Sequence, residues 1–166
     1  MRKKQEIWVR SPRGFRIFLV SSVLLVAMLL AGCGLFVRTR SLLGGRVDVS
    51  VTLSETANGN HPVAVDLLIV RNPELLERLL GMGGREWFAE RDQIRRDFLP
   101  GEDLDVWSWE WVPGQRVPDQ EIPLAAGAKG GLVFAEYLSP GAHRARFDPF
   151  SDLHLTFHET GFEVRQ

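Results

Sequence analysis

Residues 46–70 read RVDVSVTLSETANGNHPVAVDLLIV and contain two strand-like runs joined by a polar connection. In the first run, apolar residues alternate with polar ones, as in a strand that buries only one face. The apolar positions are Val47, Val49, Val51 and Leu53, and the polar positions are Asp48, Ser50 and Thr52. The first run therefore predicts a half-buried β-strand.

The second run is largely apolar on both of its faces. One face carries Val63, Val65, Leu67 and Ile69, and the other carries Ala64, Leu68 and Val70. A short run of this kind is consistent with a strand that is buried on both sides. We therefore expect a central strand of a sheet here.

The connection between the two runs is longer than closing a hairpin requires. Asn58-Gly59 alone would close a two-residue hairpin, yet residues 54–62 separate the two runs. Either the extra residues reach a partner, or they form an ordinary surface loop that tolerates insertion. In both cases we expect polar residues with no core to fill.

After these two runs the pattern changes to helical spacing and then returns to strands. Residues 73–81 and 85–99 have apolar residues at helical spacing, and Pro100-Gly101 ends the second segment. Strand-like runs follow at residues 104–112, 131–141 and 152–159, between Gly and Pro turns, and GFEVRQ at residues 161–166 closes the chain. Six or so short strands with one helical insertion predict a mainly β fold, an antiparallel β-sandwich.

The first 32 residues have the organisation of a secretory signal. Basic residues precede the apolar run IFLVSSVLLVAMLL at residues 17–30, which is shorter than the roughly 20 residues that span a bilayer. LAGC at residues 30–33 resembles the lipobox of bacterial lipoproteins and contains the only cysteine, Cys33. The resemblance implies cleavage before Cys33 and a covalent lipid on it. The alternative is an uncleaved signal anchor with an ordinary buried cysteine.

We divide the chain into a signal peptide at residues 1–32, a lipidated cysteine and tether at 33–45, and a β-sandwich domain at 46–166. Cleavage would leave 134 residues with fourteen basic and twenty acidic side chains, because six bases and one acid lie in the signal. The formal charge would then be −6, with Lys129 as the only lysine. An acidic domain without a basic cluster is a poor nucleic-acid binder, and we expect no nucleic-acid partner.

No group of residues singles out an enzyme or a metal site. His154 and His158 would lie about 13 Å apart on one strand, at about 3.3 Å per residue, too far to share one ion. There is no Gly-x-Ser-x-Gly motif, and the glycines match no phosphate-binding loop. The acids at positions 86, 90 and 92 lie among arginines, where i, i+4 pairing on a solvated helix face explains them. We expect no metal, no cofactor apart from the lipid, and no small-molecule substrate.

Trp107, Trp109 and Trp111 alternate along the third strand-like run. On a strand all three side chains would point to one side of the sheet. We expect them in the core, and the alternative is an exposed surface for a partner, since Trp is enriched at binding hot spots.

Taken in order, these features resemble the TssJ lipoproteins of bacterial type VI secretion systems. The order is a lipobox cysteine, a short tether, an alternating strand, a polar loop ending NGNHPVAV, an apolar strand, a helical insertion with EWF, then PGQ and a late GGLVFAEY strand. The resemblance covers residues 46–165 and implies a transthyretin-like β-sandwich with added helical elements. It also implies a lipid-anchored position in the outer membrane, facing the periplasm. Gly34 agrees with this, because it stands where the inner-membrane retention signal of lipoproteins has Asp.

The resemblance further implies a partner and a site. In that family the loop between the first two strands binds the periplasmic C-terminal region of the inner-membrane component TssM. Carried over by position, the loop consists of Ser54, Glu55, Thr56, Ala57, Asn58, Gly59, Asn60, His61 and Pro62. Asn58 and Pro62 best match the family pattern.

We therefore predict a non-enzymatic lipoprotein that helps to assemble and anchor the type VI secretion membrane complex by binding TssM. Two alternatives stay open. One is a pilotin-like binding module of another envelope machine, which would have a different partner. The other is a periplasmic hydrolase, which would need His, Asp or Glu side chains that converge in a closed pocket.

Overall fold

A computed structural model describes residues 45–166 of the chain. The predicted signal peptide, Cys33 with its lipid, and the tether up to residue 44 lie outside the described residues. Eight strands, two α-helices and one short 3-10 helix form within the described range. The strands are β1 (Arg46–Leu53), β2 (Val63–Val70), β3 (Leu104–Trp111), β4 (Gln120–Pro123), β5 (Gly130–Glu136), β6 (Arg144–Phe147), β7 (Leu153–Phe157) and β8 (Phe162–Arg165). The helices are η1 (Ala57–Asn60), α3 (Pro73–Gly81) and α4 (Gly84–Asp97).

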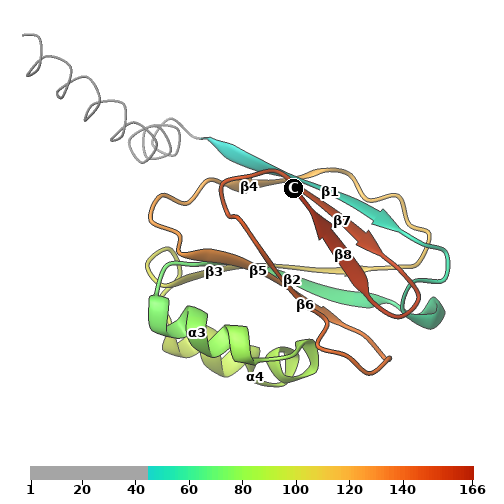
Figure 1. Ribbon diagram of the computed structural model, residues 1–166, viewed down its shortest axis with the longest axis horizontal. Helices are drawn as coiled ribbons and strands as arrows, with labels where there is room; N and C mark the ends of the chain where they lie inside the picture. The colour runs from blue at the N-terminus through green and yellow to red at the C-terminus, as the bar shows by residue number, and fades with distance from the viewer. Residues whose placement is uncertain (1–44) are drawn as a thin grey trace, which may run out of the picture. The chain divides into compact units, whose positions relative to one another are not determined.

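The strands form two sheets of four strands each. Sheet A has the order β4-β1-β7-β8, and sheet B has the order β3-β2-β5-β6. Figure 1 shows sheet A, sheet B and the helices as three successive layers, with α3 and α4 on the side of sheet B that faces away from sheet A. The predicted mainly β sandwich with a helical insertion is confirmed.

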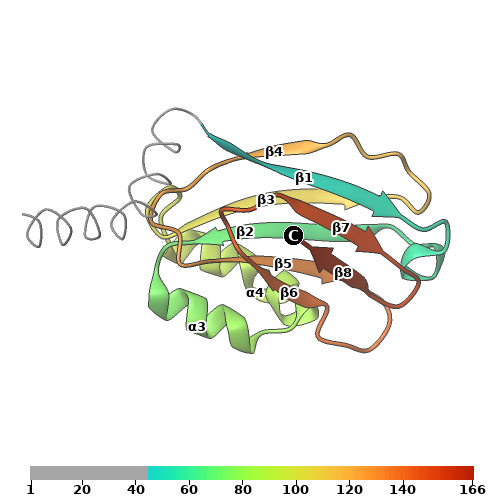
Figure 2. The same ribbon diagram turned by 45° about the horizontal axis from the view of Figure 1, so that its top comes forward.

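The strand pairing departs from the prediction at one place. β1 and β7 run parallel, with Val49 opposite Leu153 and Leu53 opposite Phe157, whereas the other five strand pairs are antiparallel. Five strands, β2 to β6, separate β1 from β7 along the chain, so no hairpin connects these two neighbours and forces them to run in opposite directions. Figure 2 shows β1 and β7 side by side in sheet A.

Sheet B confirms the expectation of a central strand. β2 pairs with β3 along its whole length and with β5 on its other side. Seven of the eight β2 residues are buried, because sheet A covers one face of the strand and the helices cover the other. Period two therefore places successive β2 residues in two different apolar layers.

The two apolar layers have different members. The layer between the sheets includes Val49, Val65, Leu155 and Phe157, all with 0% exposure. The layer between sheet B and the helices includes Leu68, Leu79, Trp87, Ile94 and Phe134, also with 0% exposure. Trp87 of α4 stacks on Phe134 of β5 with ring centroids 5.2 Å apart. Aromatic contacts of this kind add about 0.5–1.5 kcal/mol beyond the area they bury.

Local sequence explains how the helices begin. The Asn72 side chain accepts hydrogen bonds from the backbone N–H groups of Glu74 and Leu75, and Pro73 follows it, which is a favoured N-terminal arrangement. Gly84 opens α4 where a Cβ atom would lie 2.5 Å from the Ala135 carbonyl oxygen. Only glycine therefore lets α4 approach β5 this closely.

Two of the strands, β4 and β6, were not predicted from the sequence. β4 reads QEIP and β6 reads RARF, so each has four residues and no run of alternating apolar positions. They form because longer neighbours pair with them: β1 with β4, and β5 with β6. Both are edge strands, which need a partner on only one side.

Candidate partner-binding surface

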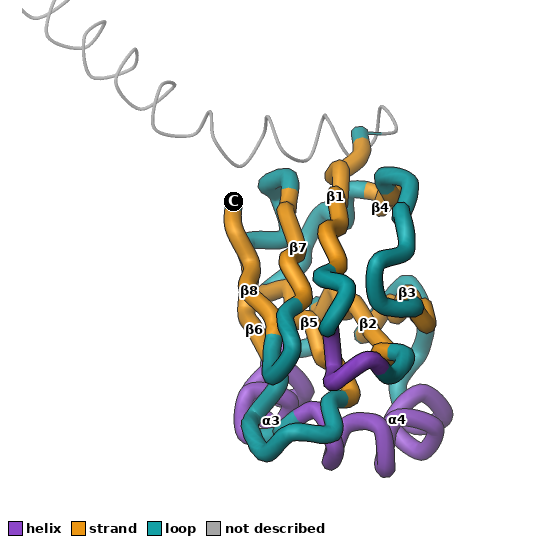
Figure 3. The backbone as a smooth tube through the Cα atoms, turned by 90° about the vertical axis from the view of Figure 1, so that its right-hand side faces the viewer, coloured by secondary structure: helices purple, strands orange, loops and turns teal. Residues whose placement is uncertain are grey.

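The β1–β2 connection has a structural reason for its length. β1 belongs to sheet A and β2 to sheet B, so residues 54–62 must cross from one sheet to the other. The two-residue hairpin considered from the sequence is therefore ruled out, because β1 and β2 do not pair. Figure 3 shows η1 within this crossing, between the ends of the two strands.

The sequence indicated a polar connection that faces solvent, but the structure buries part of it. Ala57 has 0% exposure and belongs to the core between the sheets, and Asn58 is only 4% exposed. Glu55, Thr56, Asn60 and His61 are exposed. The predicted binding loop therefore divides into residues that hold it in place and residues that face outward.

Asn58 fixes the loop to both sheets. Its backbone N–H donates to the His158 carbonyl oxygen after β7, at 3.1 Å. Its side-chain oxygen accepts from the Leu138 N–H after β5, at 2.7 Å, and its amide donates to the Pro62 carbonyl oxygen at 2.8 Å. A buried side chain whose donor and acceptor are both used rigidifies its surroundings.

The sequence Asn-Gly-Asn suits the backbone of this loop. Asn58, Gly59 and Asn60 have φ values of 48°, 60° and 65°. Glycine adopts this left-handed region freely, and asparagine adopts it more readily than most other residues do. The three residues are needed for the backbone path between the sheets, rather than for a hairpin turn.

Two exposed apolar side chains lie beside the loop, and the sequence analysis did not single them out. Leu138 is 62% exposed and Val112 is 56% exposed. Leu138 follows β5, and its N–H is bonded to Asn58. Val112 follows β3, where the Gly114 N–H donates to the Ser54 carbonyl oxygen at 3.1 Å. The sequence could have identified both residues, because each is an apolar residue at the end of a strongly strand-like run, shortly before a Pro-Gly turn.

We call the outward-facing residues at this end of the sandwich the distal surface. It consists of Glu55, Thr56, Asn60, His61, Val112 and Leu138. The loop at its centre is held from beneath by Asn58, and its apolar residues come from the ends of two strands. Such a surface combines a fixed backbone with accessible apolar side chains, so a contact there would bury apolar area with little loss of conformational entropy.

The described residues do not assemble a catalytic or metal-binding group. Residues 45–166 contain no cluster of three or more His, Cys, Asp or Glu residues that could hold a metal ion. His154 contacts the Ser50 hydroxyl at 2.7 Å through Nδ1 and the Thr52 hydroxyl at 3.3 Å through Nε2. A serine–histidine–acid triad needs a carboxylate at the second ring nitrogen, and a hydroxyl occupies that place here.

The acids on α4 pair differently from the prediction. Glu90 binds Arg78 of α3 at 2.9 Å, between the two helices, instead of pairing within its own helix. Glu86 and Asp92 are exposed. These side chains therefore belong to a solvated helix surface.

The three tryptophans all face the layer between the sheets. Trp111 is 4% exposed and packs edge-on against Phe157, with centroids 5.4 Å apart. Trp107 and Trp109 are partly buried against the same core, because β3 is an edge strand and leaves this side of the layer open. The expected core position is confirmed fully for Trp111 and partly for the other two.

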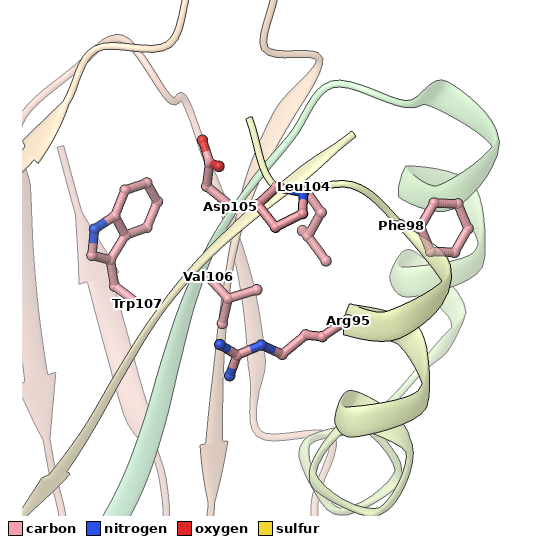
Figure 4. A pocket seen from close by; sticks show the side chains of 7 residues that line it. Arg95, Phe98, Leu104, Asp105, Val106 and Trp107 are labelled. Atoms are coloured by element: carbon pink, nitrogen blue, oxygen red, sulfur yellow. The ribbon is translucent and has the colours of Figure 1, made fainter. Parts of the chain in front are cut away.

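A hollow of about 260 Å³ lies between α4 and β3. Figure 4 shows Arg95 of α4 reaching toward Val106, while Trp107 lies on the other side of β3. The lining residue Asp105 is bound to Arg71 at 2.7 Å. Within residues 45–166 the Arg95 guanidinium has no partner, so the hollow offers apolar walls and one free cation, without a pair of groups that could act on a substrate.

Comparison with known proteins identifies the fold. Serratia marcescens Lip, described as a membrane-bound component of the type VI secretion system, matches with a TM-score of 0.54 and 15% identity, over 73% of this chain and 97% of that chain. The lipoprotein TssJ1 from Pseudomonas aeruginosa matches with a TM-score of 0.53 and 16% identity, over 74% and 95%. The chain has the TssJ fold.

Two further solved structures match the fold of this chain. A chain in a structure described as a type VI membrane complex matches with a TM-score of 0.56 and 16% identity, over 73% of this chain and 98% of that one. A chain in a structure described as the TssM C-terminal domain from EAEC matches with a TM-score of 0.50 and 15% identity, over 73% and 96%. The sequence itself matches no protein-family model and no curated protein. Among residues 45–166, neither helix is long and apolar enough to cross a membrane.

Proposed function

We propose that the protein is a non-enzymatic lipoprotein, anchored in the outer membrane through Cys33, that binds the periplasmic C-terminal region of TssM. In this role it helps to assemble and anchor the membrane complex of a type VI secretion system. The observation that carries the proposal is the TssJ fold, found in proteins described as components of that system. The rigid β1–β2 loop at one end of this fold supplies the binding site.

The chemistry of the distal surface supports binding of a folded protein partner. Leu138 and Val112 would bury apolar side chains, and the neighbouring Asn60 and His61 offer polar groups at the rim. Because Asn58 already holds the loop in one conformation, binding loses little conformational entropy. No pocket or nucleophile is needed for such a role.

The direct test compares two exposed leucines at opposite ends of the domain. Leu138 lies on the distal surface, and Leu99, which is 58% exposed, lies before β3 at the other end. The full lipoprotein in detergent would be titrated with the purified TssM periplasmic region. Leu138→Ser should raise Kd by about tenfold or more, because burying a leucine contributes about 1.5–3 kcal/mol. Leu99→Ser is the matched control and should leave Kd unchanged.

Two results would refute the proposal. The first is that the unmodified protein does not bind TssM, which would make a pilotin-like role with another partner the better interpretation. The second is that the two leucine substitutions change Kd equally, which would place the contact elsewhere on the domain.

The loop itself requires a more selective variant than replacement of residues 54–62. Replacing all nine would remove Ala57 from the core and Asn58 from its hydrogen bonds, so the fold would change together with the surface. The double variant Glu55→Ser/His61→Ser alters exposed side chains only. It should weaken TssM binding while the midpoint of thermal unfolding stays the same.

A further inference from the structure

A second hollow lies at the end of the sandwich opposite the distal surface. Its volume is about 450 Å³, and its walls include Lys129, Arg146, Phe147, Pro149 and Phe150. The Lys129 N–H donates to the carbonyl oxygen of Val70, the last residue of β2, at 2.7 Å. The distal loop precedes the first residue of the same strand, so β2 separates the two sites by its whole length.

Two basic side chains of this hollow have no polar partner among the described residues. Lys129 and Arg146 are exposed, and neither side chain makes a hydrogen bond or an ion pair within residues 45–166. By contrast, Arg46, Arg71, Arg78, Arg91 and Arg165 each pair with a carboxylate. In an acidic domain, two free cations beside one hollow form a local site for an anion.

The backbone brings the two cations together. Arg146 Nε lies 3.8 Å from the position that a Cβ atom would take on Gly130. The guanidinium stem therefore lies over the residue that directly follows Lys129. Both residues line the same hollow.

One acid, Asp148, also lines the hollow, and its carboxylate is engaged in a local turn. Oδ1 accepts from the Phe150 N–H and Oδ2 accepts from the Ser151 hydroxyl, both at 3.1 Å. Neither oxygen forms an ion pair with Lys129 or Arg146. The two cations thus stay available to a ligand.

The hollow lies at the end where the chain enters the domain. The carbonyl oxygen of Gly45 accepts from the Leu124 N–H at 2.8 Å, and residues 124–130 lead from there to the hollow. This β4–β5 connection is on the same side of Figure 1 as the start of β1. Twelve residues lead from Cys33 to Gly45 and span at most about 40 Å. A lipid on Cys33 would therefore keep the start of β1, at this end of the domain, within about 40 Å of the membrane surface.

We propose that this hollow binds the phosphate of a phospholipid headgroup in the membrane that anchors the chain. Lysine and arginine are the side chains that bind phosphate oxygens. Phe150 and Pro149 provide an apolar wall for the glycerol and upper acyl region. The inference rests on the proposed function in one respect, the lipid anchor at Cys33. Headgroup binding would orient the domain so that its distal surface points away from the membrane.

Lys129 provides a direct readout, because it is the only lysine after residue 32. The lipoprotein would be purified in dodecyl maltoside, which has no phosphate, and transferred to nanodiscs of phosphatidylglycerol. Acetylation of Lys129 by a water-soluble reagent would be followed by mass spectrometry in both preparations. We expect acetylation to be at least fivefold slower in the nanodiscs.

Two arginine variants separate headgroup binding from simple shielding by the bilayer. Arg146→Gln should return the acetylation rate in nanodiscs to within about twofold of the rate in micelles. Arg116→Gln removes another exposed arginine, in the β3–β4 connection, and should keep the full protection. Equal rates in nanodiscs and micelles, or protection that survives Arg146→Gln, would overturn the inference.

A third arm distinguishes the lipid from soluble phosphate. Inorganic phosphate at millimolar concentration, added to the micelles, should leave Lys129 acetylation unchanged, and equal protection by it would overturn the assignment to a lipid. TssM binding by Arg146→Gln in the same detergent should match that of the unmodified protein. In the unmodified protein, absence of Lys129 protection together with intact TssM binding contradicts this inference alone, whereas protection without TssM binding contradicts only the proposed function.

Discussion

Sheets A and B have the same number of strands, but sheet A is covered on one face and sheet B on both. In β1 the residues alternate between buried and accessible positions, whereas almost every residue of β2 is buried. Antiparallel sheets tolerate one solvated face, and the outer face of sheet A carries polar side chains such as Ser50, Thr52 and His154. The difference shows that sheet B bears both apolar layers, while sheet A closes only one of them.

The two sheets are joined by specific polar contacts at the distal end. Asn58 bonds to residues after β7 and after β5. Tyr137, next to β5, donates its hydroxyl to the carbonyl oxygens of Gly161 at 2.7 Å and His158 at 3.1 Å, in the β7–β8 turn. The distal surface is therefore the place where the relative position of the sheets is fixed by directional bonds as well as by packing.

The largest loss of stability is expected when the buried charge of sheet B is removed. Asp66 of β2 has 0% exposure, accepts from the Trp87 indole N–H at 2.8 Å and pairs with Arg91 of α4 at 3.1 Å. Asp66→Ala should lower the free energy of unfolding by about 3 kcal/mol, because it leaves the indole and the guanidinium without their partner. Urea unfolding measures the change. Asp66→Asn keeps an acceptor for the indole and should lose less, so equal losses would contradict this account.

A smaller effect is expected for Tyr137→Phe, which removes the hydroxyl that bridges the sheets. The loss at pH 7 should be about 1 kcal/mol, the usual contribution of one hydrogen bond. Burial raises the pKa of the Tyr137 hydroxyl above its usual range, so above about pH 10 the unfolded chain releases this proton first.

The stabilisation by Tyr137 is thus complete below about pH 10 and decreases as the pH rises further. Unfolding of both proteins at pH 7 and at pH 11 gives the comparison. The difference in stability between wild type and Tyr137→Phe should narrow at the higher pH. A constant difference would show that the hydroxyl does not ionise in either state over this range.

The smallest change in stability is expected for a substitution on the solvated face of sheet A. Thr156 of β7 points outward between the buried Leu155 and Phe157, so Thr156→Val should change the free energy of unfolding by less than about 0.5 kcal/mol. The matched control is the adjacent Leu155→Ala, which should cost about 2–5 kcal/mol because it empties a core position. Similar values for the two variants would mean that both faces of sheet A are covered.

Much of the fold was predictable because its longest elements carry their burial pattern in the sequence. Alternation in β1, the doubly apolar β2 and the Asn-Pro start of α3 each reflect a local rule that holds in any tertiary setting. The short strands β4 and β6 were not predictable, because four residues carry no periodicity. The predicted binding loop was assigned by position, but its division into holding and outward-facing residues depended on where Ala57 and Asn58 are buried.

The sequence by itself determined the fold class and the order of the main elements, because periodicity and turn residues act over a few neighbouring positions. It also singled out residues 54–62. Only the tertiary structure decided that β1 and β2 belong to different sheets, that β1 and β7 run parallel, and that Leu138 and Val112 stand beside the loop. Only the tertiary structure also places Lys129 and Arg146 beside the same hollow. These features depend on contacts between residues far apart in the chain, and local pattern carries no information about such contacts.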